Sequence, residues 1–218
     1  MEREIIVTDD GSHSLFVKNM GETFHSKHGA VQESVHVYIN NGIKRLENNQ
    51  ISVLEFGFGT GLNALLTLQF ATDTNKKIKY ETIEAFPLIK EEYQSLNYNK
   101  FVSTNVSLQY LHELPFGKTH EVTPLFAFQK HHNKIEDFTT NNTFDIIYFD
   151  VFGYDYQSEL WSKEILTKAY QFLKPNGLFV TYACKGIVNK QLKEIGFTVE
   201  KLTGPPGKRE MICAVKKN

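Results

Sequence analysis

The stretch that decides the fold is Ile51-Ser-Val-Leu-Glu-Phe-Gly-Phe-Gly-Thr-Gly-Leu-Asn63. Residues 51–56 are mostly apolar or β-branched, as in a buried parallel strand, and residues 62–70 carry apolar side chains at helical spacing. Three glycines stand at alternate positions between them: Gly57, Gly59 and Gly61. Glycine lets such a turn tighten and lets a ligand approach the backbone. The stretch therefore predicts a strand, a nucleotide-binding type of turn and a helix.

The spacing of these glycines bears on the ligand. Dinucleotide-binding turns usually follow G-x-G-x-x-G, whereas E-x-G-x-G-x-G, which begins here at Glu55, resembles the first motif of S-adenosylmethionine-dependent methyltransferases. The turn thus favours S-adenosyl-L-methionine over NAD as the cofactor. We expect Thr60 and Asn63 to contact this methyl donor together with the glycines. Glu55 either faces the methionine end of the donor or braces its backbone, and the sequence leaves both roles open.

Length and composition describe an ordinary globular protein. The chain has 218 residues, of which 41% are hydrophobic and 22% charged, and this fits one domain with a sizeable core. No apolar run approaches the roughly 20 residues that span a bilayer. The charged start, Met1 to Glu4, has no hydrophobic signal-peptide region. We therefore expect a cytoplasmic protein without a membrane partner.

Neither a metal site nor a strongly charged surface is indicated. Cys184 and Cys213 are too few for a disulfide framework or a zinc site, and we expect both to be buried. The histidines, among them His25 and His28, lack the spacing of metal ligands, so no metal is expected. A formal net charge of −1 gives no general signal for nucleic-acid binding.

Strands and helices alternate along most of the chain. We expect strands at residues 51–56, 78–83, 125–130, 144–150, 178–182, 197–202 and 209–215, and helices at 62–70, 87–96, 159–173 and 187–195. The segment 97–124 is poorly periodic and is expected to hold a helix and an insertion. The alternation predicts a doubly wound α/β fold, and its two-strand ending resembles the Rossmann-like class I methyltransferase version of that fold. Its mostly parallel seven-stranded sheet has helices on both faces and an antiparallel strand at the C-terminus.

The first 45 residues form a separate unit in this scheme. Residues 5–7 and 15–17 flank Asp9-Asp10-Gly11-Ser12, which is a hairpin signal, and residues 31–46 have a helical pattern. We predict that residues 1–45 are an N-terminal extension that packs on the core as a partial lid. Residues 46–218 are then the methyltransferase domain.

Polar residues at the ends of two strands are candidates for holding the donor. Glu84 ends the second strand, where a carboxylate accepts both ribose hydroxyls of a nucleoside in this fold. After the third strand, the adenine amino group needs an acceptor, and related sequences usually have an aspartate there. In this chain that register falls on Asn133 or Lys134, and the side-chain carbonyl of Asn133 is the candidate acceptor.

Asp150 ends the fourth strand, beside the position of the donor methyl group. A carboxylate there holds an amine nucleophile and stabilises the positive charge that grows on nitrogen during methyl transfer. We predict that Asp150 is the catalytic residue, although a strand-end aspartate is the structural alternative. Phe152 and Tyr154, in the aromatic loop that follows, are candidates for stacking on a uridine base.

Two motifs together carry a specific resemblance. Gly57-Phe-Gly-Thr-Gly-Leu-Asn63 and Gly207-Lys-Arg-Glu-Met211, with Glu84 and Asp150 at their strand ends, are similar to the methyltransferase part of the tRNA 5-methylaminomethyl-2-thiouridine biosynthesis bifunctional protein. The resemblance covers the chain from about residue 10 onwards. It implies methyl transfer from S-adenosyl-L-methionine to the 5-aminomethyl group of 5-aminomethyl-2-thiouridine at the wobble position of tRNA.

The resemblance also implies what lies outside this chain. Many members are fused to an FAD-dependent oxidase, and no flavin-binding turn is found here, so FAD is not expected and separate enzymes would generate the aminomethyl substrate. tRNA is the expected partner. Lys185, Lys208 and Arg209 are candidates for contacts to its phosphates. The acceptor loop departs from the family pattern at Gly153, Tyr154 and Ser158.

Two alternatives remain at this stage. The first is a methyltransferase of the same fold that acts on a small-molecule amine. A contiguous positive surface made by Lys185, Lys208 and Arg209 would argue against it. The second is a non-catalytic module that binds a nucleotide or tRNA, and Asn133 at the usual aspartate position keeps this possibility open.

Overall fold

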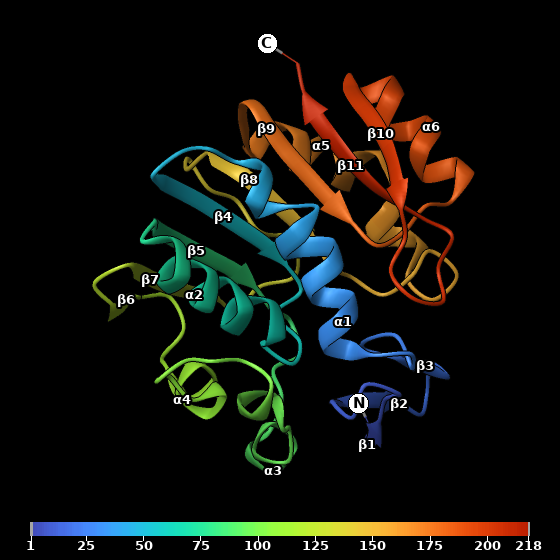
Figure 1. Ribbon diagram of the computed structural model, residues 1–218. Coiled ribbons are helices and arrows are strands. Elements are labelled where there is room, and N and C mark those ends of the chain that lie inside the picture. Colours follow the sequence, from blue (N-terminus) through green and yellow to red (C-terminus); the bar gives the residue numbers. More distant parts are fainter. Residues whose placement is uncertain (1, 218) are drawn as a thin grey trace.

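The computed structural model describes residues 2–217. Within that range the main sheet has eight strands, in the order β10-β11-β9-β8-β4-β5-β7-β6 (Figure 1). The strands β9, β8, β4, β5 and β7 run parallel, and β11 runs antiparallel between β9 and β10. The bounds are β4 (Gln50–Phe56), β5 (Lys77–Ile83), β6 (Thr119–Thr123), β7 (Phe126–His131), β8 (Phe144–Phe149), β9 (Leu173–Thr181), β10 (Phe197–Thr203) and β11 (Glu210–Lys216). The predicted class I methyltransferase topology is confirmed.

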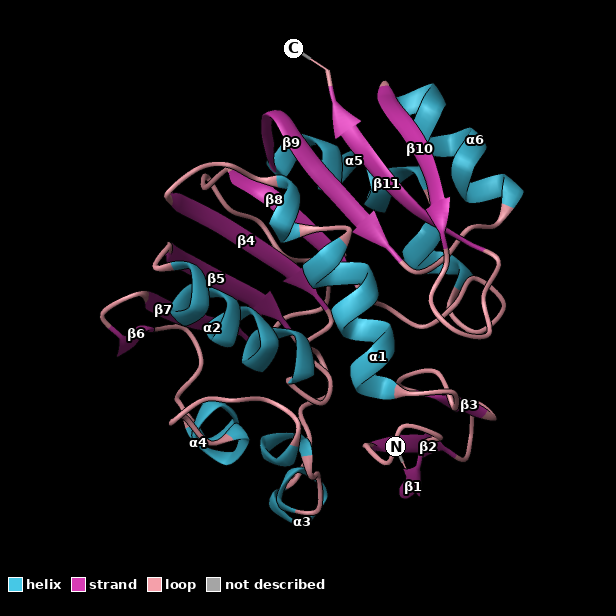
Figure 2. Ribbon diagram, in the orientation of Figure 1, coloured by secondary structure: helices cyan, strands magenta, loops and turns pink. Residues whose placement is uncertain are grey.

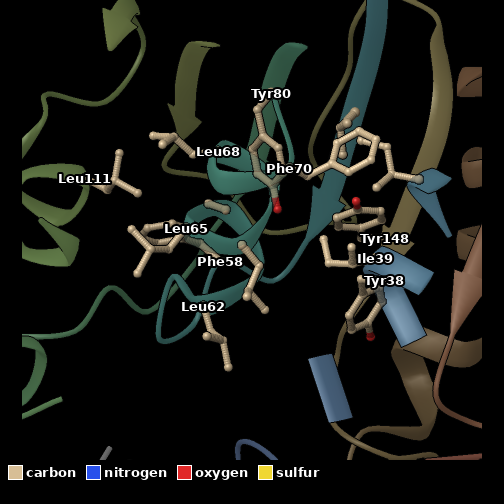
Figure 3. Close-up of a cluster of buried hydrophobic side chains, with 14 of the residues drawn as sticks. Tyr38, Ile39, Phe58, Leu62, Leu65, Leu68, Phe70, Tyr80, Leu111 and Tyr148 are labelled. Carbon is tan, nitrogen blue, oxygen red and sulfur yellow. The ribbon is translucent and has the colours of Figure 1, made fainter. Parts of the chain in front are cut away.

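Helices cover both faces of this sheet, as Figure 2 shows. The helix α2 (Leu62–Thr74) packs on one face, and α5 (Lys163–Phe172) and α6 (Gly186–Ile195) pack on the other. All six residues of β8 are buried because both of its faces are covered. Figure 3 shows the core on the α2 side, where Leu62, Leu65 and Leu68 belong to the same buried cluster as the sheet tyrosines Tyr80 and Tyr148.

Two predicted helices are shorter than the sequence suggested. The expected helix at 159–173 is a 3-10 turn, η4 (Ser158–Trp161), followed by α5. The break is at Ser162, which has extended backbone and accepts a hydrogen bond from the Ile165 N–H at 3.4 Å as the N-cap of α5. The expected helix at 87–96 is reduced to α3 (Lys90–Gln94), because Ile89 is extended and its N–H donates to the Glu92 carboxylate.

The segment 97–124 contains a strand that the sequence did not reveal. It holds η3 (Tyr98–Lys100), α4 (Leu108–Glu113) and β6, an antiparallel edge strand on β7. The β6 sequence Thr-His-Glu-Val-Thr is polar and partly exposed, so its apolar pattern is weak. This edge strand raises the sheet from the predicted seven strands to eight.

The N-terminal residues form a small sheet of their own. β1 (Arg3–Val7) pairs with β2 (His13–Val17), which pairs with β3 (Glu22–Thr23), so the predicted hairpin is confirmed. In its turn, the Asp10 carboxylate accepts hydrogen bonds from the Ser12 N–H and the Thr8 hydroxyl.

The predicted helix at 31–46 is broken into α1 (Ala30–Ser34), a π-helical segment η1 (Val35–Asn40) and η2 (Ile43–Arg45). The helix widens because the Asn41 N–H bonds to His36 O, five residues back. Val37, Tyr38 and Ile43 join the same core as α2. A domain boundary at residue 45 remains a prediction. No helix among residues 2–217 is long and apolar enough to cross a membrane.

Candidate active site

A cavity of about 500 Å³ opens where β4, β5 and β8 end at their carboxyl ends. The glycine turn and Glu84 form one part of its wall, and Asp150 and Phe152 form another. The N-terminal segment also contributes to the wall, through Arg3, Met20, Phe24 and His25. Three segments that are distant in sequence therefore enclose one space.

The glycine turn has a backbone that a larger residue would not adopt. Gly57 has φ +93°, and a Cβ atom there would lie 2.6 Å from the carbonyl oxygen of Asp150. Gly61 has φ +78° at the N-cap of α2. The turn thus needs glycine both for its conformation and for the close approach of β4 to the end of β8.

Glu84 is fixed in the cavity by the backbone around it. Its Oε2 accepts a hydrogen bond from the Gly59 N–H at 2.8 Å, and its Oε1 accepts one from the Phe86 N–H at 2.7 Å. Each oxygen keeps a further lone pair. The carboxylate is therefore pre-oriented as a hydrogen-bond acceptor for hydroxyl groups of a ligand.

Asp150 is enclosed at the end of β8. Its Oδ2 accepts a hydrogen bond of 2.7 Å from the side-chain nitrogen of Asn63, and its own N–H donates to Phe56 O at 3.1 Å. Burial raises the pKa of Asp150 to about 6, although hydrogen bonding from the Tyr38 hydroxyl opposes the rise. Asp150 is thus an acceptor that gains and loses a proton near neutral pH.

Glu55 lies one layer deeper, behind Asn63, which lines the cavity. Glu55 is 0% exposed and is not part of the cavity wall, and its Oε1 accepts a second hydrogen bond from the Asn63 side-chain nitrogen, at 3.1 Å. Burial raises the pKa of Glu55 well above its usual range. Asn63 therefore joins two carboxyl groups, one buried and one at the cavity.

The wall after β7 differs from the sequence expectation. Asn133 is exposed and does not line the cavity, whereas Lys134, Ile135 and Glu136 do. The register was short by one residue because β7 extends to His131.

Only some of the aromatic rings in the loop after β8 line the cavity. Phe152 and Tyr156 line it, and the Phe152 ring meets Phe24 edge-on at 5.0 Å between centroids. Tyr154 is not in the wall. It packs against the core on the α5 side, and the Lys185 ammonium lies 5.4 Å from its ring centroid.

The three candidate basic residues lie outside the cavity wall, and two of them are paired. Lys185 forms an ion pair with Asp155, and Lys208 forms one with Glu33. The Lys208 ammonium also lies 3.8 Å from the centroid of the Tyr182 ring. Arg209 is exposed and has no ion-pair partner among the described residues. These residues therefore do not form one free positive surface in this conformation.

His25 is a cavity residue for which the sequence pattern gave no signal. Its Nε2 lies 3.4 Å from the Thr60 hydroxyl and its Nδ1 lies 3.2 Å from the Ser14 hydroxyl. Burial lowers the pKa of His25 to about 4, so the ring is neutral at physiological pH. His25 precedes the glycine turn by more than thirty residues, and only the folding of the N-terminal segment onto the turn brings them together. No group of three or more His, Cys, Asp or Glu side chains among residues 2–217 is arranged to hold a metal.

The sheet topology and the turn define the class I methyltransferase fold. A family model described as S-adenosyl-L-methionine-dependent methyltransferase matches residues 89–217, which is more than half of the chain. The protein therefore belongs to this family of methyltransferases, and S-adenosyl-L-methionine is its cofactor.

Individual relatives narrow the comparison. The tRNA 5-methylaminomethyl-2-thiouridine biosynthesis bifunctional protein MnmC of Burkholderia multivorans is 26% identical over 223 residues, which cover 94% of this chain and 33% of that protein. The same protein of Campylobacter jejuni serotype O:6 is 33% identical over 211 residues, which cover 89% of this chain and 33% of that protein. The resemblance to the methyltransferase part of MnmC is confirmed. The chain spans about a third of the length of the curated relatives it matches.

Solved structures share the fold. MnmC2 from Aquifex aeolicus superposes with a TM-score of 0.79 at 24% identity, and the match covers 99% of this chain and 70% of that one. Spermidine synthase from Thermotoga maritima gives a TM-score of 0.64 at 16% identity, over 99% of this chain and 69% of that one. At these identities the likeness establishes the architecture.

The residues around the cavity suit S-adenosyl-L-methionine. The glycine turn leaves room that a Cβ atom would fill, and Glu84 presents acceptor oxygens of the kind that bind ribose hydroxyls. Four acidic residues line the cavity, Glu84, Glu136, Asp150 and Glu159, against two basic ones, Arg3 and Lys134. This excess of negative charge favours a cationic sulfonium.

Proposed function

We propose that this protein transfers a methyl group from S-adenosyl-L-methionine to the exocyclic amine of 5-aminomethyl-2-thiouridine at the wobble position of tRNA. The observation that carries the proposal is the position of Asp150. This residue lines the same cavity as the glycine turn and the aromatic residue Phe152, and its Oδ2 is held by the Asn63 amide. The family membership supplies the donor, and MnmC relatives suggest the acceptor.

The donor side is assigned to the turn and the strand end next to it. The backbone of Gly57 and Gly59 would approach the donor, and Glu84 would bind its ribose hydroxyls. Lys134, Ile135 and Glu136, rather than Asn133, would lie along the adenine, because they line the cavity. When bound, the sulfonium supplies an electrophilic methyl group whose departure leaves a neutral thioether.

The acceptor side is assigned to Asp150 and the aromatic residues. An incoming ammonium gives a proton through the Asp150 carboxylate to water, so Asp150 is charged again and the free amine remains hydrogen-bonded to it. As the N–C bond forms, the carboxylate stabilises the positive charge that develops on nitrogen. Phe152 and Tyr156 offer flat surfaces for the uracil ring of an extruded nucleotide. The aminomethyl group itself would come from a separate enzyme activity.

One assay tests the proposal directly. The protein is incubated with S-adenosyl-L-methionine labelled in the methyl group and with tRNA whose wobble uridine carries the 5-aminomethyl group, and the digested nucleosides are then separated. We expect label in the 5-methylaminomethyl nucleoside and none with tRNA that lacks the aminomethyl group. Label on no uridine would refute the assignment of the acceptor.

A second candidate acceptor is favoured by one specific observation. Lys185 and Lys208 are held in ion pairs with Asp155 and Glu33, so these two lysines do not supply the free positive surface expected around a tRNA site. We therefore retain a small-molecule amine as the alternative substrate of the same site. A competition experiment distinguishes the two substrates. An unlabelled small amine would abolish the labelling of tRNA only if the amine binds in the same cavity. Poor binding of the donor, with no methylation of either amine, would instead indicate the non-catalytic module that binds a nucleotide or tRNA.

A further inference from the structure

A buried polar strip lies between α2 and the sheet, where apolar side chains usually pack. Glu55 lies near the middle of the sheet, beside Thr82 of β5 and Tyr148 of β8 in the strand register. Asn63 comes from the first turn of α2, and Tyr80 lies two residues before Thr82. All five residues are at most 3% exposed. Such a strip disfavours folding unless its groups are well paired, so its position beneath the active site calls for an explanation.

One amide group, that of Asn63, connects the polar strip to Asp150. The side-chain nitrogen of Asn63 has two hydrogens and donates one to Glu55 Oε1, at 3.1 Å, and the other to Asp150 Oδ2, at 2.7 Å. If the amide were turned over, its carbonyl oxygen would face both carboxyl groups and the two hydrogen bonds would be lost. Glu55 and Asp150 together therefore fix the orientation of Asn63.

The ion-pair and hydrogen-bond partners of Glu55 indicate whether its carboxyl group is protonated or charged. No lysine, arginine or histidine makes an ion pair with Glu55 among residues 2–217. The buried atoms Glu55 Oε2, Thr82 Oγ1 and the Tyr80 hydroxyl have no hydrogen-bond partner, although both neighbours interact with the carboxyl group. A fully buried carboxyl group without a cationic partner is favoured in its neutral form, although the Thr82 and Tyr80 hydroxyls are donors that oppose the rise in its pKa. The neutral form also removes the repulsion between two carboxylates that share one amide.

We propose that Glu55 is a positioning residue for methyl transfer, which in its neutral form holds the Asn63 amide so that this amide fixes the Asp150 carboxylate in the cavity. Asp150 then keeps its position in the cavity and accepts the hydrogen bond of the substrate amine. The inference rests on the proposed function only in taking Asp150 as the group that meets the amine. The charged and titratable groups around the pair are Glu33, Lys208, Tyr38 and Tyr182 near Asp150, and Tyr80 and Tyr148 near Glu55.

Two substitutions separate this role from a contact with the donor. Glu55→Gln retains an oxygen for the Asn63 amide and is neutral at every pH, so kcat should stay within about threefold of the wild-type value. Glu55→Leu has a similar volume but frees the Asn63 amide, and kcat should fall about 10- to 100-fold while the Kd for S-adenosyl-L-methionine is unchanged. The acidic limb of the kcat profile should move to higher pH in Glu55→Leu and stay in place in Glu55→Gln. If Glu55→Gln loses as much activity as Glu55→Leu, or if Glu55→Leu keeps full activity, the proposal is wrong.

Infrared spectroscopy gives a readout that needs neither the acceptor nor a folded Glu55→Leu variant. The wild-type protein at pH 7.5 should show the carbonyl stretch of a protonated carboxylic acid, and Glu55→Gln should lack that band. A wild-type spectrum without the band would overturn the neutral form. Failure of the wild-type protein to methylate tRNA would instead refute only the proposed acceptor, because the band does not depend on it.

Discussion

The side-chain nitrogen of Asn63 lies 2.7 Å from Oδ2 of Asp150 and joins the first turn of α2 to the end of β8. Asn63 follows the glycine turn by two residues, so the element that would hold the donor and the candidate catalytic carboxylate are linked directly. The close contact of Gly57 with the Asp150 carbonyl oxygen strengthens the same link. A small movement of either element would therefore be transmitted to the other.

Replacement of Asp150 by asparagine tests its chemical role. Asp150→Asn keeps the shape of the side chain and an oxygen for Asn63 but removes the negative charge. We expect kcat to fall by about 10² to 10⁴ while donor binding is retained, as for the loss of a general acid or base. Single-turnover kinetics and calorimetry with S-adenosyl-L-methionine measure the two effects. The matched control is Asp137→Asn, at an exposed position outside the cavity wall. Undiminished turnover in Asp150→Asn would remove this residue from the mechanism.

The pH dependence of turnover follows from the same carboxyl group. Because burial raises the pKa of Asp150 to about 6, its charged form predominates above that pH and its neutral form below. We expect kcat to fall roughly tenfold per pH unit below about 6. The Asp150→Asn variant should lack this limb at its low residual rate. A wild-type profile that is flat from pH 5 to 8 would contradict the assignment.

Gly57→Ala tests the geometry of the turn. The new Cβ atom would lie 2.6 Å from the Asp150 carbonyl oxygen, and the positive φ disfavours alanine in any case. We expect a loss of about 1–3 kcal/mol in the free energy of unfolding and weaker donor binding. The control is Gly186→Ala at the start of α6, where a Cβ atom would meet nothing within 4 Å. Denaturant unfolding of both variants checks the expectation, and equal stability would contradict it.

The sequence predicted the parts of this protein whose pattern is local. The glycine turn, the apolar β8 and the hairpin at the N-terminus each carry their signal within a few residues, and each was predicted correctly. β6 was missed because an exposed edge strand needs few apolar residues. The break at Ser162 was missed because the apolar spacing continues through it, although serine before a helix is a cap signal.

The candidate site divides in the same way. Glu84 and Asp150 were predicted because they follow strands whose ends share one edge of the sheet, and both line the cavity; their roles remain predictions. His25 and Phe24 reach the cavity only because the N-terminal segment packs beside it. The spacing of residues in the sequence does not predict this packing. The pairing of Lys208 with Glu33 joins the loop before β11 to α1, and the sequence could show only that the charges exist.

Histidine burial predicts how stability depends on pH. Burial lowers the pKa of His112 to about 4, and its Nε2 donates to the Thr60 carbonyl at 3.0 Å behind the glycine turn. An unfolded histidine has a pKa of about 6.5, so the unfolded chain binds the additional proton between these values. The contribution of His112 to stability is therefore complete above about pH 6.5 and is lost as the pH falls towards 4, by up to about 3 kcal/mol.

Urea unfolding of the wild type and of His112→Gln at pH 7, 5.5 and 4.5 tests this dependence. The variant should lose less stability on acidification than the wild type. His132→Gln, at an exposed histidine, is the matched control. Parallel curves for His112→Gln and the wild type would contradict the prediction.

The final prediction concerns how a tRNA would meet the basic residues. Arg209 is exposed and has no ion-pair partner among the described residues, whereas the Lys208 ammonium is paired with Glu33, whose side chain is only 7% exposed. If tRNA is the acceptor and Arg209 contacts a phosphate, Arg209→Gln should reduce the slope of log K against log salt by about 1. Lys208→Gln should instead leave Glu33 short of a partner and lower the free energy of unfolding by about 1–3 kcal/mol. Filter binding over a range of salt and denaturant unfolding measure the two effects. A changed salt slope for Lys208→Gln, with unchanged stability, would contradict this prediction. It would mean that the ion pair of Lys208 with Glu33 opens when tRNA binds and that Lys208 then contacts a phosphate.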